Sequence, residues 1–307
     1  MSSLRPPEAW ALAGIGLLAV ALRLFGNGFG LPDTFEPDEP KMVNHALAFG
    51  LGDLNPHYFV YPAFQMYLLF GVFGALFVVL RLTGVVASVE GFKLLFLSDP
   101  TVFYRVGRGL TALFGLGAVL LVFLLARRLY GGSRVALLAA FALAVHPVDV
   151  LHGHYITADV PMTFFLLLGL VFLAPALEEP SHRAFAWAGV AAGLATATKY
   201  SGLIFVLPVL AAAALGARRA AWPFLPKALA AFGLALVAAF CLASPFSVVE
   251  WRKTLDAMQF ILDVKRDGQF GLARGASWGT YLNLAFLQSP LALASLLGVG
   301  WALWRRR

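Results

Sequence analysis

The chain contains little charge and a single cysteine. Only 13% of its 307 residues are charged, whereas 60% are hydrophobic, and the mean hydropathy is +0.81. Soluble domains are roughly one quarter charged, so this composition excludes a water-soluble globule. The one cysteine, Cys241, lies in an apolar run, which excludes a disulfide within the chain and a cysteine-based metal site. We interpret Cys241 as a packing residue.

Basic residues outnumber acidic ones, giving a net charge of +7 and a pI near 9.8. Many of them cluster in short segments between apolar runs, a pattern that orients membrane helices rather than gripping nucleic acid. We therefore predict no nucleic-acid partner. The first apolar run starts near residue 9 and lacks a small-residue cleavage site, so we expect a retained helix instead of a signal peptide.

Apolar runs near the length of a membrane span recur along the whole chain. They predict an all-α fold, a polytopic transmembrane helical bundle of about eight spans in a single domain covering residues 1–307. The expected spans cover residues 9–25, 106–126, 134–151, 160–177, 185–199, 201–217, 227–243 and 287–304. With about eight spans, both termini and the arginine-rich connectors lie in the cytoplasm, as the positive-inside tendency requires.

Residues 62–80 are also apolar enough to span, but one further crossing would place the arginine-rich connectors outside. We predict instead that this segment lies along the outer interface, or forms a hairpin with residues 92–97. A first external loop is expected at about residues 26–104, with interfacial helices, and a last external loop at about 244–286.

Carboxylates stand out in the predicted external segments. Glu36, Asp38 and Glu39 fall within four residues after the first span, and Asp159 stands at the start of another span. Carboxylates at a membrane surface can act as a general base, bind a metal or face solvent. An acid at a helix start can also be a simple cap. The residues alone leave these readings open.

Lys199 is the lone cation in a short external turn between two apolar spans, against the positive-inside tendency. An ammonium at the rim of a helix bundle suits the phosphate of a lipid substrate, although simple snorkelling to the interface gives the same pattern. Arg105 and Arg108 lie at the start of the second expected span, residues 106–126, on the same predicted external side, so they could join Lys199 in binding a phosphate.

Aromatic and histidine side chains accompany the charges. His57, Tyr58 and Tyr61 precede the apolar segment 62–80, where they would form either an aromatic belt or part of a glycan pocket. His152 and His154 alternate in the second external loop and suit a metal site or ordinary hydrogen bonding.

Several of these runs, taken in order, resemble the GT-C superfamily of membrane glycosyltransferases, close to bacterial protein O-mannosyltransferase and lipid A aminoarabinose transferase relatives. Asp38 and Glu39 resemble the acidic motif of the first external loop. The runs 57–62, 105–115, 152–161 and 193–203 resemble its His/Tyr-Pro segment, arginine-led span, second-loop aspartate motif and Lys-Tyr segment. Relatives generally carry further C-terminal spans, which are not expected within this chain.

The resemblance implies transfer of a sugar from a polyprenyl-phosphate donor to an acceptor hydroxyl on the outer face, with inversion. Asp38 would be the base, and Glu39 its structural or metal-binding neighbour. Asp159 would orient the acceptor or position a divalent ion with Asp38. Lys199 and Arg105 would stabilise the phosphate leaving group.

Further residues and partners follow from the same resemblance. The residues expected to line the substrate site are His57, Tyr58, Tyr61, His154 and Tyr200, with Arg108 on the donor phosphate. No cofactor is required, although a divalent metal held by Asp38, Glu39 and Asp159 stays open. The expected partners are the lipid bilayer, the lipid-linked donor and a lipid, glycan or protein acceptor, in the plasma (inner) membrane of a bacterium.

Two other classes of protein would also show many apolar spans. A lipid or solute transporter or flippase usually has charges or broken helices at the bilayer midplane and repeated halves. Here the expected spans lack internal charge apart from Arg23, and the halves are not similar. A non-catalytic membrane scaffold is the remaining alternative.

Overall fold

The computed structural model describes residues 4–179, 181–217, 224–267 and 279, and all regular secondary structure in that part of the chain is helical. The α-helices are α1 Pro6–Leu24, α2 Asp38–Ala48, α3 Phe64–Leu82, α4 Val89–Ser98, α5 Thr101–Tyr130, α6 Ser133–Ala144, α7 Pro147–His152, α8 Asp159–Leu173, α9 His182–Thr198, α10 Val206–Ala217, α11 Phe224–Ala243, α12 Pro245–Val249 and α13 Trp251–Asp267. The 3-10 helices are η1 Phe49–Leu51, η2 Ala174–Leu177 and η3 Tyr200–Phe205. The predicted all-α fold is confirmed.

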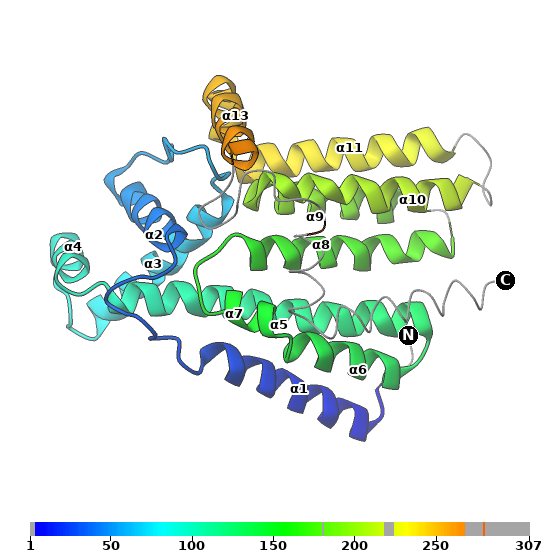
Figure 1. Ribbon diagram of the computed structural model, residues 1–307, viewed down its shortest axis with the longest axis horizontal. Coiled ribbons are helices and arrows are strands. Elements are labelled where there is room, and N and C mark those ends of the chain that lie inside the picture. Colours follow the sequence, from blue (N-terminus) through cyan, green and yellow to red (C-terminus); the bar gives the residue numbers. More distant parts are fainter. Residues whose placement is uncertain (1–3, 180, 218–223, 268–278, 280–307) are drawn as a thin grey trace.

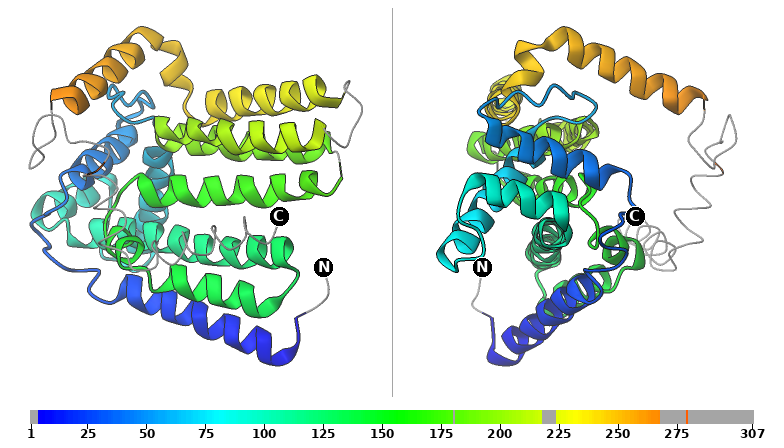
Figure 2. Two further views of the ribbon diagram at one scale, coloured as in Figure 1. Left: turned by 45° about the vertical axis from the view of Figure 1, so that its right-hand side comes forward. Right: turned by 90° about the vertical axis from the view of Figure 1, so that its left-hand side faces the viewer.

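The long helices form a bundle whose members reverse direction from one to the next. Helices α1, α5, α6, α8, α9, α10 and α11 run along the long axis, whereas α2, α4 and α13 lie across one end (Figures 1 and 2). Helices α5, α8 and α10 begin at that end, and α1, α6, α9 and α11 finish there (Figure 1). Residues far apart in the sequence therefore meet at the end that carries α2.

Five described helices are long and apolar enough to cross a membrane, as a polytopic membrane fold requires. They are Pro6–Leu24, Phe64–Leu82, Thr101–Tyr130, Asp159–Leu177 and Phe224–Ala243. The predicted span at residues 287–304 and the end of the loop at 244–286 lie outside the described residues. The count of about eight spans therefore stays a prediction, as does the packing role of Cys241, which lies half-buried in α11.

The predicted continuous span at residues 134–151 is wrong. The structure breaks it into α6 and α7, because Pro147 has no backbone N–H and His146, the residue before it, takes an extended conformation with ψ of 118°. Helix α6 has 12 residues, which corresponds to roughly 18 Å at 1.5 Å per residue. It is therefore shorter than a complete crossing.

Helix α3 covers most of the apolar segment whose placement was uncertain from charge alone. It crosses the α2 end of the bundle obliquely instead of running alongside α5 and α8 (Figures 1 and 2). Its contacts are with α2, α5 and α9, and Phe77 packs against Phe92 of α4 with ring centroids 5.3 Å apart. The stretch predicted as the first external loop thus contains α2, α3 and α4.

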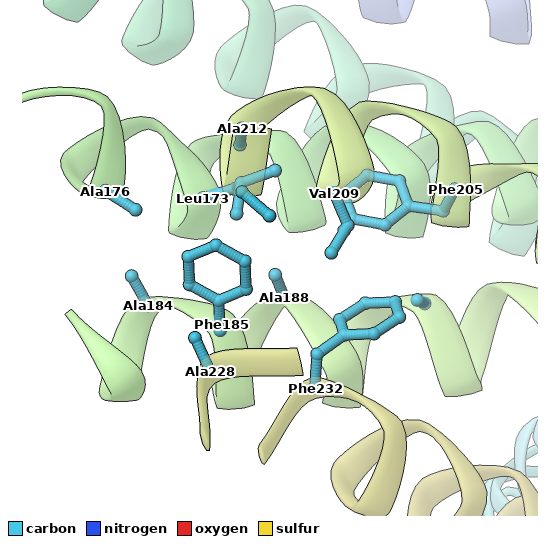
Figure 3. Packing of buried hydrophobic residues seen from close by; sticks show 12 residues of the cluster. Leu173, Ala176, Ala184, Phe185, Ala188, Phe205, Val209, Ala212, Ala228 and Phe232 are labelled. Atoms are coloured by element: carbon cyan, nitrogen blue, oxygen red, sulfur yellow. The ribbon is translucent and has the colours of Figure 1, made fainter. Parts of the chain in front are cut away.

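An apolar cluster holds the second half of the bundle together. Phe185 of α9 lies in the centre of this cluster, with Leu173 of α8 and Val209 of α10 on one side and Phe232 of α11 nearby (Figure 3). Small residues let α9 and α11 approach closely: a Cβ built on Gly189 would lie 2.3 Å from the Phe232 carbonyl oxygen. Close packing of this kind is how small residues join helices in membranes.

Candidate active site

Acidic and basic side chains from three distant segments meet at the α2 end of the bundle. Asp38 is the first residue of α2, Asp159 is the first residue of α8, and Lys199 directly follows α9. Because α8 begins where α9 ends, the carboxylate of Asp159 and the ammonium of Lys199 reach each other across the two helices (Figure 1). The antiparallel order of the helices therefore places these charges together.

Asp38 accepts two hydrogen bonds at this end. The hydroxyl of Tyr61 donates to its Oδ2 at 2.7 Å, and the ammonium of Lys41 donates to its Oδ1 at 2.9 Å. The segment that carries Tyr61 makes two such contacts: Tyr61 bonds to Asp38, and the carbonyl of Phe59 accepts a hydrogen bond from the hydroxyl of Tyr200 at 3.0 Å. The carboxylate is 28% exposed, so an incoming group can reach it.

The environments of the neighbouring carboxylates move their pKa values in opposite directions. Burial raises the pKa of Asp38, but hydrogen bonds from Lys41 and Tyr61, with the charges of Lys41 and Lys199, lower this pKa by more. Its net pKa lies below the ordinary value. For Glu36, burial and the charge of Asp38 raise the pKa, and the charge of His152 opposes that rise only in part. Asp38 is therefore the more readily ionised of the two carboxyl groups.

Burial and the hydrogen bond to Asp38 raise the pKa of Tyr61, and the charges of Asp38 and Asp159 add to the effect. The tyrosine is thus a neutral donor that holds Asp38. Its response to both aspartates indicates that Tyr61 lies within reach of both charges.

Lys199 and Asp159 form a partly exposed ion pair. The ammonium of Lys199 donates to Oδ1 of Asp159 at 2.6 Å, and the two side chains are 30% and 45% exposed. An ammonium has three donors, so this bond leaves the others for a ligand. The structure places Asp38, Tyr61, Asp159 and Lys199, all predicted site residues, in one neighbourhood.

Glu39 and Arg108 form a fully buried pair beneath this cluster. The guanidinium donates to both carboxylate oxygens of Glu39, at 2.8 and 2.7 Å, and also to the carbonyls of Asn27 and Phe29. The N–H of Ile156 donates to Oε1 of Glu39 at 2.9 Å. Both residues are 1% exposed or less. Their hydrogen bonds join α2 and α5 to the loop after α1 and to the loop that carries Ile156. The structural role expected of Glu39 fits this geometry, whereas the phosphate role of Arg108 has no support in it.

The contacts of Arg105 and His57 are with residues outside the Asp38 neighbourhood. Arg105 is exposed beside Asn27 and Gly28, where it lines an open depression with the loop after α1. His57 is exposed in a loop with a φ of 49°, and its Nε2 lies 2.8 Å from Oδ2 of Asp53. The predicted roles of these two residues in substrate binding therefore stay predictions.

The remaining predicted substrate residues have different surroundings. Tyr58 stacks on His45 with centroids 4.7 Å apart and lies 6.5 Å from the ring of Tyr61, which keeps it beside the cluster. Both ring nitrogens of His154 contact backbone carbonyls, those of Val150 and Phe25 at 2.7 and 2.8 Å. Its ring therefore joins α7 to the end of α1. Tyr200 likewise has a structural contact, because its hydroxyl donates to the carbonyl of Phe59 in the loop that carries Tyr61.

The sequence left open a divalent metal held by Asp38, Glu39 and Asp159. Among the described residues, no group of three His, Cys, Asp or Glu side chains is arranged to hold a metal ion. Glu39, one of the three expected ligands, already accepts bonds from Arg108 and Ile156. We therefore derive no step through a metal.

Two features were not predicted from the sequence. Lys41 follows Asp38 by one helical turn, a spacing that brings their side chains together and could have indicated the contact. Arg23, buried in α1, donates to the carbonyls of Ala19 and Ala144 and pairs with Asp149 of α7. Its partner is far away in the sequence, so no local pattern could have revealed this pair.

Known proteins resemble this chain in sequence and in fold. The model of the family described as dolichyl-phosphate-mannose-protein mannosyltransferase matches residues 104–248, which include Asp159 and Lys199. An undecaprenyl phosphate-alpha-4-amino-4-deoxy-L-arabinose arabinosyl transferase of Pseudomonas aeruginosa (strain LESB58) is 30% identical over 175 residues, covering 54% of this chain and 31% of the relative. An uncharacterized protein of Aquifex aeolicus (strain VF5) is 34% identical over 97 residues, covering 32% of this chain and 19% of that protein.

Among solved structures, the protein O-mannosyltransferase Pmt1-Pmt2 complex of S. cerevisiae, bound to the sugar donor, resembles the fold. The TM-score is 0.58 at 20% identity, with 82% of this chain and 35% of that chain covered. The chain thus spans about a third of the length of the transferases that it matches. These findings confirm the resemblance that the motifs predicted, to the GT-C superfamily of multi-pass membrane glycosyltransferases.

Proposed function

We propose that this chain transfers a sugar from a polyprenyl-phosphate-linked donor to an acceptor hydroxyl on the extracytoplasmic face of the membrane, with inversion at the anomeric carbon. One observation carries the proposal. Asp38 accepts a hydrogen bond from Tyr61 beside the Asp159–Lys199 pair, at the end of a membrane bundle. The donors named for the relatives, undecaprenyl phosphate and dolichyl phosphate sugars, share the polyprenyl phosphate group.

The chemistry needs one base and one site for developing negative charge. The acceptor oxygen attacks the anomeric carbon as its proton passes to Asp38, and the bond from that carbon to the phosphate oxygen breaks. A single displacement inverts the anomeric carbon. Asp38 can serve as the base because its carboxylate is ionised and 28% exposed, so an acceptor hydroxyl can reach it. The phosphate departs as a stable anion and needs no general acid.

Lys199 is the cation best placed to stabilise the departing phosphate. Its ammonium is partly exposed and bonds to Asp159, which leaves donors free for a phosphate oxygen. Lys41 brings a second positive charge to the other side of Asp38. Arg105 keeps its proposed role as a further phosphate contact only if the donor reaches the loop after α1.

The distribution of positive charge supports an extracytoplasmic site. The turn between α5 and α6 lies at the opposite end of the bundle from α2 (Figure 1). It is flanked by Arg127, Arg128 and Arg134. Short connectors rich in arginine favour the cytoplasmic side, so the Asp38 cluster faces the outside of a plasma membrane, with the start of α1 in the cytoplasm.

An aromatic cavity at the opposite end of α2 from Asp38 suits the prenyl tail of the donor. It has a volume of about 390 Å³ between the end of α2, α3 and α4. Phe70, Phe73 and Phe77 line one side, and Phe92 and Phe96 line the other. Such a cavity is concave and apolar, as lipid-chain sites are. A prenyl chain whose phosphate lies near Lys199 would have to extend along α2 to reach it.

The test of this function is sugar transfer by purified protein in lipid vesicles supplied with radiolabelled undecaprenyl-phosphate sugars and a mixture of glycolipid acceptors. Asp38→Asn should lower kcat/KM by at least about a hundredfold, because the base is lost while the shape stays. Asp256→Asn, on the exposed surface of α13, serves as the matched control and should leave the rate unchanged. Unchanged transfer by Asp38→Asn would remove Asp38 from the base role.

A further inference from the structure

The segment that carries Tyr61 is tied to the ends of two helices from the second half of the bundle. The N–H of Ala63 donates to Oγ of Ser244 at 2.9 Å, and the hydroxyl of Tyr200 donates to the carbonyl of Phe59 at 3.0 Å. Ser244 directly follows α11, and Tyr200 is the second residue after α9. Tyr61 therefore lies midway between two anchored positions of its own backbone.

The two helices that supply these anchors pack closely against each other. A Cβ built on Gly193 of α9 would lie 2.5 Å from the carbonyl oxygen of Leu236 in α11. Both helices finish at the end of the bundle that carries α2 (Figure 1). Side chains supported by packed helices hold a site more precisely than side chains supported by loops. The two anchors therefore belong to one rigid frame.

Ser244 is buried, and its hydroxyl makes two contacts. The residue is 0% exposed, and its Oγ lies 2.8 Å from Oγ of Ser247 in α12 while it accepts the bond from Ala63. Ala63 is 1% exposed and stands directly before α3, where a helix offers no backbone acceptor for the N–H. Ser244 thus supplies the acceptor that this buried N–H needs.

The covalent structure of the segment transmits these anchors to Tyr61. Pro62 follows it, and a proline ring fixes its own φ and favours an extended backbone at the residue before it. Because each anchor is two residues away, the main chain at Tyr61 has little freedom to move. The hydroxyl of Tyr61 donates to Oδ2 of Asp38 at 2.7 Å, a distance that depends on where this main chain lies.

We propose that Ser244 is a positioning residue, whose hydroxyl fixes the backbone of the segment 59–63 so that Tyr61 can hold Asp38. The inference rests on the proposed function, in which Asp38 is the base. It adds a residue from outside the runs that carried the family resemblance. Burial raises the pKa of Asp38, and the bond from Tyr61 is among the contacts that lower it. Loss of the Ser244 hydroxyl should weaken that bond and so raise the pKa of Asp38.

Other titratable groups also interact with Asp38. The charges of Lys41 and Lys199 lower its pKa, and its own charge raises the pKa of Glu36 and of Tyr58. The variants below leave all four of these side chains in place, so a change at Asp38 reports on the contact with Tyr61.

Modification by a carbodiimide tests the proposal without any need for sugar transfer. The reagent attacks a protonated carboxyl group, so above the pKa its rate at Asp38 rises about tenfold for each pH unit by which this pKa rises. The rate is measured at about pH 6 with a water-soluble carbodiimide and glycine ethyl ester, by mass spectrometry of the Asp38 peptide. Ser244→Ala should raise it roughly twofold to tenfold, as a partly lost hydrogen bond would. Ser98→Ala, at the exposed end of α4, is the matched control and should leave the rate unchanged.

A double variant separates positioning from a general loosening of the fold. In a Tyr61→Phe background, Ser244→Ala should have no further effect, because the bond that it supports is already absent. The rate at Glu90, exposed on α4, should be equal in all variants. If Ser244→Ala does not fold, Tyr200→Phe replaces it, because that variant removes the other anchor and should act in the same direction.

The outcomes distinguish this inference from the proposed function. A raised rate that disappears in the Tyr61→Phe background supports the positioning role, and if the parent then transfers no sugar, only the proposed function fails. The positioning role is rejected if Ser244→Ala keeps the parent rate, whether or not sugar is transferred. It is also rejected if the effect persists in the Tyr61→Phe background, or if the rate at Glu90 rises as well.

Discussion

At the scale of single residues, two neighbours in one acidic run have opposite environments. Successive residues on a helix point about 100° apart, so Asp38 faces the open cluster while Glu39 faces the interior. Their chemistry is the same, and only the direction of the side chain separates a candidate base from a structural acid. The family resemblance already assigned the base role to Asp38 and left Glu39 as a structural or metal-binding neighbour, and the buried pair with Arg108 fits the structural alternative.

The buried pair is expected to matter for folding more than for chemistry. Glu39→Gln leaves Arg108 buried with an uncompensated charge, which typically costs about 3–5 kcal/mol. Thermal unfolding in detergent should show a large loss of stability. The double variant Glu39→Gln/Arg108→Met should recover part of it, because no unpaired charge remains. A single variant as stable as the parent would show that the pair is not needed for the fold.

The hydrogen bond from Tyr61 should set the acid limb of the activity profile. A carboxylate whose pKa is lowered in the folded protein stays ionised until the pH falls through that lowered value. Burial raises the pKa of Asp38 but is outweighed by bonds from Lys41 and Tyr61, so Tyr61→Phe should raise this pKa. Initial rates measured against pH should then fall at a higher pH than in the parent.

Tyr130→Phe, exposed at the far end of α5, is the control for that profile. An acid limb that stays in place in Tyr61→Phe but moves in Glu36→Gln would assign the limb to Glu36 instead.

At the scale of elements, glycines in α9 determine how closely two helices pack. Gly189 and Gly193 are four residues apart and face α11, a spacing that membrane helices use for close contact. Of these two glycines, the sequence analysis included only Gly193, as the first residue of the run 193–203 that resembles the Lys-Tyr segment. Its packing role became visible once the distance to the α11 backbone was known.

Gly193→Ala should therefore destabilise the bundle. Its new Cβ would lie 2.5 Å from the Leu236 carbonyl oxygen, so α9 and α11 would have to separate. Gly233→Ala on α11 is the matched control, because nothing lies within 4 Å of its Cβ, and alanine favours the helix by up to about 1 kcal/mol. The midpoint temperature of thermal unfolding should fall for Gly193→Ala and should stay the same or rise for Gly233→Ala. Equal stability would contradict the close contact.

At the scale of the whole molecule, the charges divide the bundle into two ends. The arginine-flanked turn of α5 and α6 is at one end, and α2, α3 and α4 are at the other (Figure 1). This division supports the orientation inferred from the connectors, although α3 is itself long and apolar enough to cross a membrane.

Thiol labelling of intact cells checks the orientation. Ser98→Cys, exposed at the end of α4, should react with a membrane-impermeant maleimide from outside, because the proposed orientation places the end of the bundle that carries α2 outside the cell. Gly132→Cys, between α5 and α6, should react only after the membrane is opened. Labelling of Ser98→Cys exclusively from the cytoplasmic side would restore a single crossing for residues 62–80.

The sequence by itself determined that this is a helical membrane protein and which polar runs are informative, because apolar length and local charge are properties of neighbouring residues. The tertiary structure decided which of those residues meet. It paired Arg108 with Glu39 and Arg23 with Asp149, and it placed Tyr61 on Asp38. Such contacts join segments far apart in the chain, and only the order and direction of the packed helices bring them within bonding distance.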